Sequence, residues 1–171
     1  GVIGTATYTS SEYAPYVAGL IAGTPINRSI TYAELPLEDV TKRLTNSQVV
    51  AALAAGSLVF TNDGEKVKVE QGLTTSGKKI RSIRARQAIA TDIARTAADN
   101  YIGKLDNNAD GQVTLMVAIK AYLETLEIEN VLTAPVVALD PERPSVGDSV
   151  FLTISYGEVD SIERIFLTIN I

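Results

Sequence analysis

IATDIARTAADNYIGKLDNNADGQV, residues 89–113, contains the end of one helical pattern, a polar loop and the start of a second helical pattern. In its first part, apolar residues occupy every fourth position: Ile89, Ile93, Ala97 and Tyr101. This spacing places them on one face of an α-helix. The loop GKLDNNADG is rich in asparagine and glycine, which tolerate the backbone angles of tight turns. The stretch therefore predicts two amphipathic helices joined by a turn.

The second of these helices is predicted from about Gln112 to Glu127. Its inward-facing residues are expected to be Val113, Met116, Ile119, Leu123 and Leu126. The first helix is predicted from about Gln87 to Tyr101. Both helices have one apolar face to bury, so this part of the chain is expected to contribute to a packed core.

The loop also resembles the first half of a calcium-binding EF-hand loop. Asp106, Asn108 and Asp110 alternate, and Gly111 follows at the position of the sharp turn. However, the twelfth position, which needs a bidentate glutamate, is the apolar Val117. We therefore interpret the loop as a structural turn built by Asn107, Asn108, Asp110 and Gly111. A small calcium-binding module remains the alternative function, and no metal or cofactor is expected.

The remaining patterns predict an α+β fold, a mixed β-sheet flanked by helices. Helices are predicted at 10–23, with Ser10 or Ser11 as the cap, and at 46–56, with Asn46 or Ser47 as the cap. A β-hairpin is predicted from the runs LVFTN and EKVKVE on either side of Asp63-Gly64. The other extended segments are expected at 29–35, 39–44, 149–156 and 163–171, the last two after a link containing Pro135, Pro141 and Pro144.

The segment GLTTSGKK, residues 72–79, has the spacing of a phosphate-binding loop through Gly72, Gly77 and Lys78. Such a loop needs a serine or threonine next, where this chain has Lys79, and it must continue directly into a helix. The alternation in KIRSIRAR predicts a strand over residues 79–86 instead. A flexible turn between strands is therefore favoured, and a nucleotide-binding module is kept as an alternative.

Composition excludes several classes of function. The 171 residues suit a single domain over residues 1–171, and the chain has no cysteine and no histidine. Thiol or imidazole catalysis and histidine- or cysteine-ligated zinc are therefore excluded, and an enzyme is not expected. The net charge of −5 disfavours nucleic acid as a partner. No apolar run approaches the roughly 20 residues of a membrane span, so no membrane partner is expected.

Four segments carry a resemblance to a known family. They are APYVAGLIAGTPINRSITY at 14–32, GSLVFTNDGEKVKVEQGLTT at 56–75, IATDIARTAADNYIGKLDNNADGQ at 89–112 and VDSIERIFLTINI at 159–171. In this order and spacing they resemble the C-terminal part of contractile tail sheath proteins of tailed phages, prophages and phage-tail-like bacteriocins. The most specific pieces are YIGK followed by NN-x-DG and the final alternating segment.

The resemblance implies a structural subunit of a contractile tail sheath in a virion or phage-tail-like particle. Such sheaths are assembled in the bacterial cytoplasm, polymerise around an inner tube and contract to drive the tube through the target envelope. Expected partners are other copies in the sheath rings, the tail tube protein, and baseplate and tail terminator proteins. Nothing in this sequence matches the N-terminal sheath region, so the chain is expected to be a piece of a longer protein.

The last residues are the predicted subunit-contact site. Residues 157–171 are expected to form a hinge at GEVDS, 157–161, and a C-terminal arm whose strand is added to a neighbour's sheet. Its contact residues would be Ile165, Leu167, Ile169 and Ile171, with Arg81, Arg84 and Arg86 as charged partners of an acidic neighbour. The alternative is an ordinary strand paired with residues 149–156. A third reading, an interaction domain of an unrelated secreted or surface protein, predicts no self-association.

Overall fold

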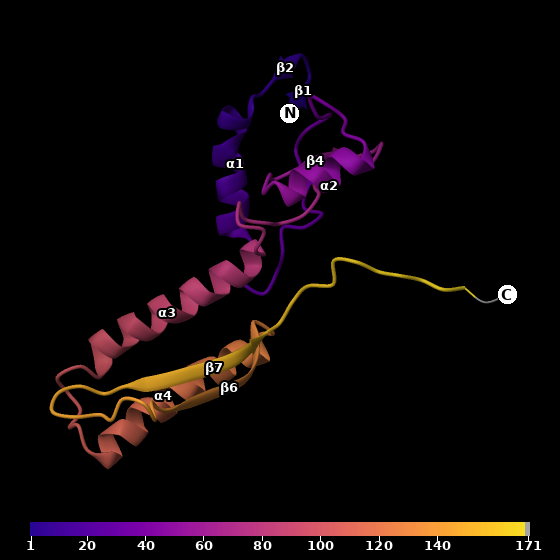
Figure 1. Ribbon diagram of the computed structural model, residues 1–171. Coiled ribbons are helices and arrows are strands. Elements are labelled where there is room, and N and C mark those ends of the chain that lie inside the picture. Colours follow the sequence, from indigo (N-terminus) through magenta and orange to yellow (C-terminus); the bar gives the residue numbers. More distant parts are fainter. Residues whose placement is uncertain (170–171) are drawn as a thin grey trace. The chain divides into compact units, whose positions relative to one another are not determined.

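A computed structural model of the chain describes residues 1–169, and these residues form two compact units. Unit 1 comprises Gly1–Arg84 and the C-terminal residues from Asp160; unit 2 is Ala85–Val159. The described residues contain four helices and several short, antiparallel sheets (Figure 1). The predicted α+β class is confirmed. None of the described helices is both long enough and apolar enough to cross a bilayer.

The two helices of the N-terminal half begin at matching capping boxes. Helix α1 spans Ser10–Gly23 and α2 spans Asn46–Ala54. Thr9 caps α1 and exchanges hydrogen bonds with Glu12, while Thr45 caps α2 and exchanges them with Gln48. Both helices were predicted, but each cap lies one residue before the predicted positions. Threonine is suited to this position because its hydroxyl accepts a hydrogen bond from the backbone amide of the third helical residue. The side chain of that third residue in turn accepts a hydrogen bond from the backbone amide of the threonine.

The sheet of unit 1 has the strand order β3-β5-β4, with β3 at Glu34–Leu35, β4 at Phe60–Asn62 and β5 at Val67–Val69. The predicted hairpin is confirmed, since β4 and β5 pair antiparallel. Four residues connect the strands, and the Asp63 carboxylate accepts the amides of Glu65 and Lys66 at 3.0 and 2.8 Å. The buried core of unit 1 consists of Tyr13, Ile30, Leu35, Leu37, Val67 and Val69.

The prediction of extended strands at 29–35 and 39–44 in unit 1 is wrong for most of these residues. Only Glu34–Leu35 of the 29–35 segment is a strand, because Tyr32 takes a left-handed backbone angle, φ +59°, that breaks an extended run. In the 39–44 segment, Asp39 forms only an isolated bridge to Val2. Instead, a short hairpin that was not predicted pairs β1, Val2–Ile3, with β2, Ala6–Thr7.

Helix α3 spans Ile80–Asn100, so the predicted strand over residues 79–86 is wrong. The buried residues Arg81, Ala85 and Ile89 recur every four residues and continue the apolar stripe backwards by two turns. An arginine side chain can complete such a stripe because its methylene stem is apolar. The period-two interpretation placed Ile83 on one face with Arg81 and Ala85, whereas in the helix the side chain of Ile83 is exposed.

Unit 2 is built on α4, Ala109–Ile128, and on the antiparallel pair β6, Leu132–Leu139, and β7, Leu152–Glu158 (Figure 1). Strand β6 packs against α4, and the buried residues there are Ile119, Leu123, Leu126, Val131 and Leu132. The predicted inward position of Val113 is wrong, since its side chain is half exposed. Helix α4 begins three residues earlier than predicted, at Ala109.

Strand β6 was missed because it contains Pro135. Proline lacks the amide proton for a ladder hydrogen bond and is tolerated in a strand only at an edge or a bulge. Here both conditions hold: β6 is in a two-stranded sheet, and its register with β7 shifts between Thr133 and Val136. Ala134 takes a positive φ of +49° at this irregularity.

Residues 160–169 form neither a helix nor a strand. The alternative of an ordinary strand paired with residues 149–156 is therefore wrong for its described residues, because β7 pairs with β6. The predicted contact residue Ile171 lies outside the described residues.

Candidate assembly interface

Residues 164–169, called the C-terminal arm below, expose nearly all of their apolar side chains. The exposed fractions are 74% for Ile165, 92% for Phe166, 82% for Leu167 and 84% for Ile169. A run of large apolar side chains at this exposure is unusual on a soluble surface and typically marks an interaction site. Three of the predicted contact residues belong to this run. Phe166 was not predicted, although its size and place between Ile165 and Leu167 were visible in the sequence.

Immediately before the arm, the carboxylate of Glu163 is almost fully buried, with 6% of its side chain exposed. Its Oε1 accepts hydrogen bonds from the hydroxyls of Ser29 and Thr31, at 3.0 and 2.9 Å. Its Oε2 accepts one from Gln71 Nε2 at 3.1 Å and lies 3.1 Å from Lys79 Nζ. We call Ser29, Thr31, Gln71 and Lys79 the carboxylate socket. Burial alone would raise the pKa of Glu163, but these hydrogen bonds outweigh it and lower the pKa.

Two further contacts hold the residues just before Glu163. Lys79 Nζ also lies 2.5 Å from Asp160 Oδ2, and Arg81 donates to Ser161 Oγ at 2.8 Å. Residues 160–163 are therefore attached to unit 1, and the arm projects beyond them. The predicted hinge at 157–161 includes Gly157 and Glu158, which belong to β7.

The three arginines predicted as contacts to an acidic neighbour each have a partner in their own chain. Arg81 is buried, with 6% of its surface exposed, and holds Ser161. Arg84 donates to the carbonyl oxygens of Thr24 and Ala22, at 2.9 and 3.3 Å, at the C-terminus of α1. Arg86 forms an ion pair with Glu158. These partners, Ser161, Thr24, Ala22 and Glu158, all lie outside the C-terminal arm.

The loop before α4 uses its polar residues in the turn itself. Asn108 caps α4, and its Oδ1 accepts the amide of Gly111 at 2.9 Å. Asn107 donates to the carbonyl oxygens of Gly147 and Ser149, at 2.9 and 3.2 Å. A Cβ at Gly111 would lie 2.0 Å from the Asp106 carbonyl oxygen, so the close backbone approach accounts for this glycine. No cluster of three or more acidic side chains placed to hold a metal occurs in the described part of the chain.

The loop at residues 72–79 does continue directly into a helix, contrary to the prediction, since α3 begins at Ile80. Its amides nevertheless donate within the chain: Gly77 to Thr74 O, Lys78 to Thr74 Oγ1 and Ile80 to Gly72 O. Lys79 stands where a magnesium-binding hydroxyl would be needed, and it faces Asp160 and Glu163. A phosphate would have to displace these interactions, so the geometry does not fit nucleotide binding.

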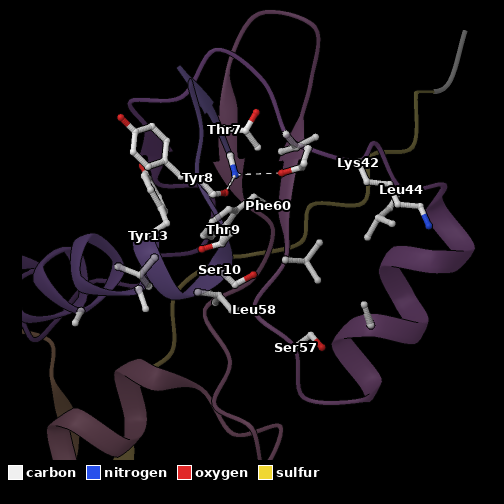
Figure 2. A pocket seen from close by; sticks show the side chains of 18 of the residues that line it. Thr7, Tyr8, Thr9, Ser10, Tyr13, Lys42, Leu44, Ser57, Leu58 and Phe60 are labelled. Carbon is white, nitrogen blue, oxygen red and sulfur yellow. Dashed lines mark hydrogen bonds between the residues drawn. The ribbon is translucent and has the colours of Figure 1, made fainter. Parts of the chain in front are cut away.

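Unit 1 also contains an open cavity of about 880 Å³ between α1, α2 and β4 (Figure 2). Its lining includes the apolar or aromatic residues Tyr13, Leu58 and Phe60 and the hydroxyl-bearing residues Thr7, Thr9 and Ser10 (Figure 2). Lys42 is the only Lys, Arg, Asp or Glu among its lining residues, which all belong to the described chain. The rest of its lining is mainly apolar or hydroxyl-bearing.

Comparisons with known proteins identify the family. Residues 74–171 match the family model described as phage tail sheath C-terminal domain, and residues 1–75 match that of the phage tail sheath protein central domain. The chain belongs to the phage tail sheath family. The predicted recognition is thereby confirmed, and the chain matches the central-domain model as well as the C-terminal-domain model. This is a family of structural proteins and not of enzymes.

Individual relatives agree with this assignment. A tail sheath protein of Clostridium phage phiCD119 is 29% identical over 128 residues, which cover 69% of this chain and 36% of that protein. The crystal structure of a sheath tail protein from Desulfitobacterium hafniense matches 97% of this chain and 42% of that chain, with a TM-score of 0.81 and 29% identity. This tail sheath chain thus spans less than half the length of these two relatives.

A more distant match shows a shared fold. A chain in the cryo-EM structure of the anti-feeding prophage baseplate aligns with 94% of this chain and 49% of its own length, with a TM-score of 0.72 at 17% identity. A sheath tail protein of Listeria innocua aligns with 88% of this chain and 42% of its own length, with a TM-score of 0.61 at 20% identity.

Proposed function

We propose that this chain is the inner, assembly-forming part of a contractile sheath subunit, and that its C-terminal arm links neighbouring subunits by adding a strand to a neighbour's sheet. The observation that carries the proposal is the exposed arm, in a chain of the tail sheath family. An extended apolar segment leaves backbone amides and carbonyls without partners, and pairing along a sheet edge satisfies them.

The acceptor in this proposal is the β6–β7 sheet of a neighbouring copy. Strands β6 and β7 have eight and seven residues, whereas the other described strands have two or three, so this sheet alone matches the six described residues of the arm. Two-stranded sheets are marginally stable and gain from a third strand. We assign the arm to the free edge of β7, because β6 contains Pro135 and the register shift.

The partners in this proposal are other copies of the chain in stacked rings, an inner tube, and baseplate and terminator proteins at the two ends, in a particle assembled in the bacterial cytoplasm. Contraction would be driven by the difference in buried interface between an extended and a shortened polymer. No bound nucleotide is required in this scheme, which agrees with the occupied amides of the 72–79 loop.

Deletion of residues 164–171 in the full-length protein tests the linkage. The deletion leaves Glu163 in its socket, so loss of long sheaths in negative-stain images would report on the arm alone. The matched pair Leu167→Asp and Thr168→Asp adds the same charge to opposite faces of the arm. We expect Leu167→Asp to shorten or abolish sheaths and Thr168→Asp to retain them. Sheaths of normal length from the deletion variant would refute the linkage.

A further inference from the structure

Backbone amides form hydrogen bonds with both hydroxyl groups of the carboxylate socket, and these bonds do not involve Glu163. Thr31 Oγ1 accepts the amide of Gly72 at 2.9 Å, and Ser29 Oγ accepts the amide of Thr31 at 3.1 Å. A hydroxyl carries one proton, so each amide occupies the acceptor side and leaves the proton for another group. Thr31 directs its proton to Glu163 Oε1 at 2.9 Å. The Ser29 proton is shared between Glu163 Oε1 at 3.0 Å and Thr31 Oγ1 at 2.9 Å.

Close packing fixes the two chain segments that form the socket. A Cβ at Gly72 would lie 2.8 Å from Ile30 Cγ1 and 3.4 Å from Ser29 Oγ, so only glycine permits this approach. Ile30 is itself buried, with 3% exposed. The hydroxyl side of the socket is therefore held by the core of unit 1 and not by the arm.

The other side of the socket supplies a cation and an amide. Lys79 Nζ is shared between Glu163 and Asp160, and Gln71 Nε2 donates to the same Glu163 oxygen as Lys79. Four donors thus converge on one carboxylate of which little is exposed. Hydrogen bonds to a charged acceptor are the stronger ones, and removing the charge from such a site leaves buried donors unsatisfied.

We infer that Glu163 in this socket is the fixed root of the C-terminal arm, so that the arm pivots at Arg164 and not within GEVDS at 157–161. The role of this fixed root rests on the proposed function, in which the arm links neighbouring subunits. A fixed root makes every subunit present its arm from the same point of unit 1. Glu163 acts as a positioning residue, while Ile165, Leu167 and Ile169 make the contacts.

The rate of trypsin cleavage after Arg164 in the purified chain reports how firmly residues 160–163 are held against unit 1. A protease needs an extended segment on both sides of the bond, so attachment of residues 160–163 slows release of the peptide 165–171. Glu163→Gln places a second amide group against Gln71 and Lys79, and we expect it to increase the cleavage rate by about tenfold, as the open population rises. Glu142→Gln, an exposed position with the same charge change, is expected to leave the rate unchanged.

Two outcomes separate this inference from the proposed function. Equal cleavage rates for Glu163→Gln and the unmodified chain would overturn the fixed root, whatever the sheaths look like. Faster cleavage together with normal sheaths from the 164–171 deletion would keep the root and refute the linkage. Lys79→Met supplies a second variant. If Lys79 and Glu163 act on one site, the rate increase of the double variant Lys79→Met/Glu163→Gln should be smaller than the product of the two single increases, and an increase equal to the product would contradict a shared site.

Discussion

Leu123 has no exposed surface and lies on α4, the helix against which β6 packs. Truncating a fully buried leucine removes its transfer free energy and leaves a cavity. We expect Leu123→Ala to lower the free energy of unfolding by about 2–5 kcal/mol, measured by urea denaturation. Val117 on the same helix is 62% exposed, so Val117→Ala should change the free energy of unfolding by no more than about 0.5 kcal/mol. Equal effects would place Leu123 outside the core.

Asp39 gives the chain a defined response to acid. Its carboxylate accepts hydrogen bonds from the side chain of Arg43, from Asn62 Nδ2 at 2.9 Å and from the backbone amide of Val40 at 2.8 Å. Together these hydrogen bonds lower the pKa of Asp39 from 3.8 to about 2. A lowered folded-state pKa means that Asp39 stabilises the fold above pH 4 and that this contribution is lost between about pH 4 and pH 2.

We therefore expect the unfolding free energy of the unmodified chain to fall as the pH is lowered below 4, and Asp39→Asn to reduce this dependence. Urea denaturation at several pH values measures both curves. Asp148→Asn is a control at an exposed aspartate. Parallel curves for the unmodified chain and Asp39→Asn would contradict the assignment.

At the scale of elements, the start of α4 depends on one side chain. Asn108 accepts the Gly111 amide at 2.9 Å, and loss of such a cap typically costs about 1 kcal/mol. We expect Asn108→Ala to lower the unfolding free energy by this amount and Asn108→Asp, which retains the acceptor, to change it little. Thermal denaturation with calorimetry compares the two. Indistinguishable midpoints would mean that the cap contributes nothing.

The elements that could be predicted are those whose signal lies within a few residues. The polar residues before the apolar runs at 10–23 and 46–56, the Asp63-Gly64 turn and the stripe through Ile119 and Leu123 are local patterns. Each gave the correct element, although the caps themselves are Thr9 and Thr45. The start of α3 and strand β6 were missed for a common reason. Each depends on tertiary packing that overrides a local rule: Arg81 is buried as part of an apolar stripe, and Pro135 is accommodated at a bulge.

The candidate site was predictable in part. The alternation of Ile165, Leu167 and Ile169 singled out a segment whose apolar side chains are exposed, and its role as a subunit contact stays a prediction. The carboxylate socket could not be predicted, because Glu163 meets hydroxyls more than 130 positions away in the sequence. A single sequence contains no pattern that relates such distant residues. The charged partners predicted at Arg81, Arg84 and Arg86 were assigned from charge alone, and the structure gives each an intrachain contact.

At the scale of the whole molecule, the proposed linkage can be reconstituted from two pieces. A chain truncated after Glu163 retains β7 with its free edge and lacks a competing arm. We expect a labelled peptide of residues 164–171 to bind it saturably, measured by fluorescence anisotropy. The same peptide with Leu167→Asp should bind at least about tenfold more weakly, since a charge would enter an apolar contact. Equal binding of both peptides would indicate non-specific adhesion.

The exposed run of Ile165, Phe166, Leu167 and Ile169 also bears on handling and storage of the protein. It is a short segment without proline or glycine, rich in β-forming residues and with little charge, which is the composition of fibril-forming peptides. Concentrated preparations should consequently develop thioflavin-positive precipitate over time, and supplying the partner surface early during synthesis would protect them.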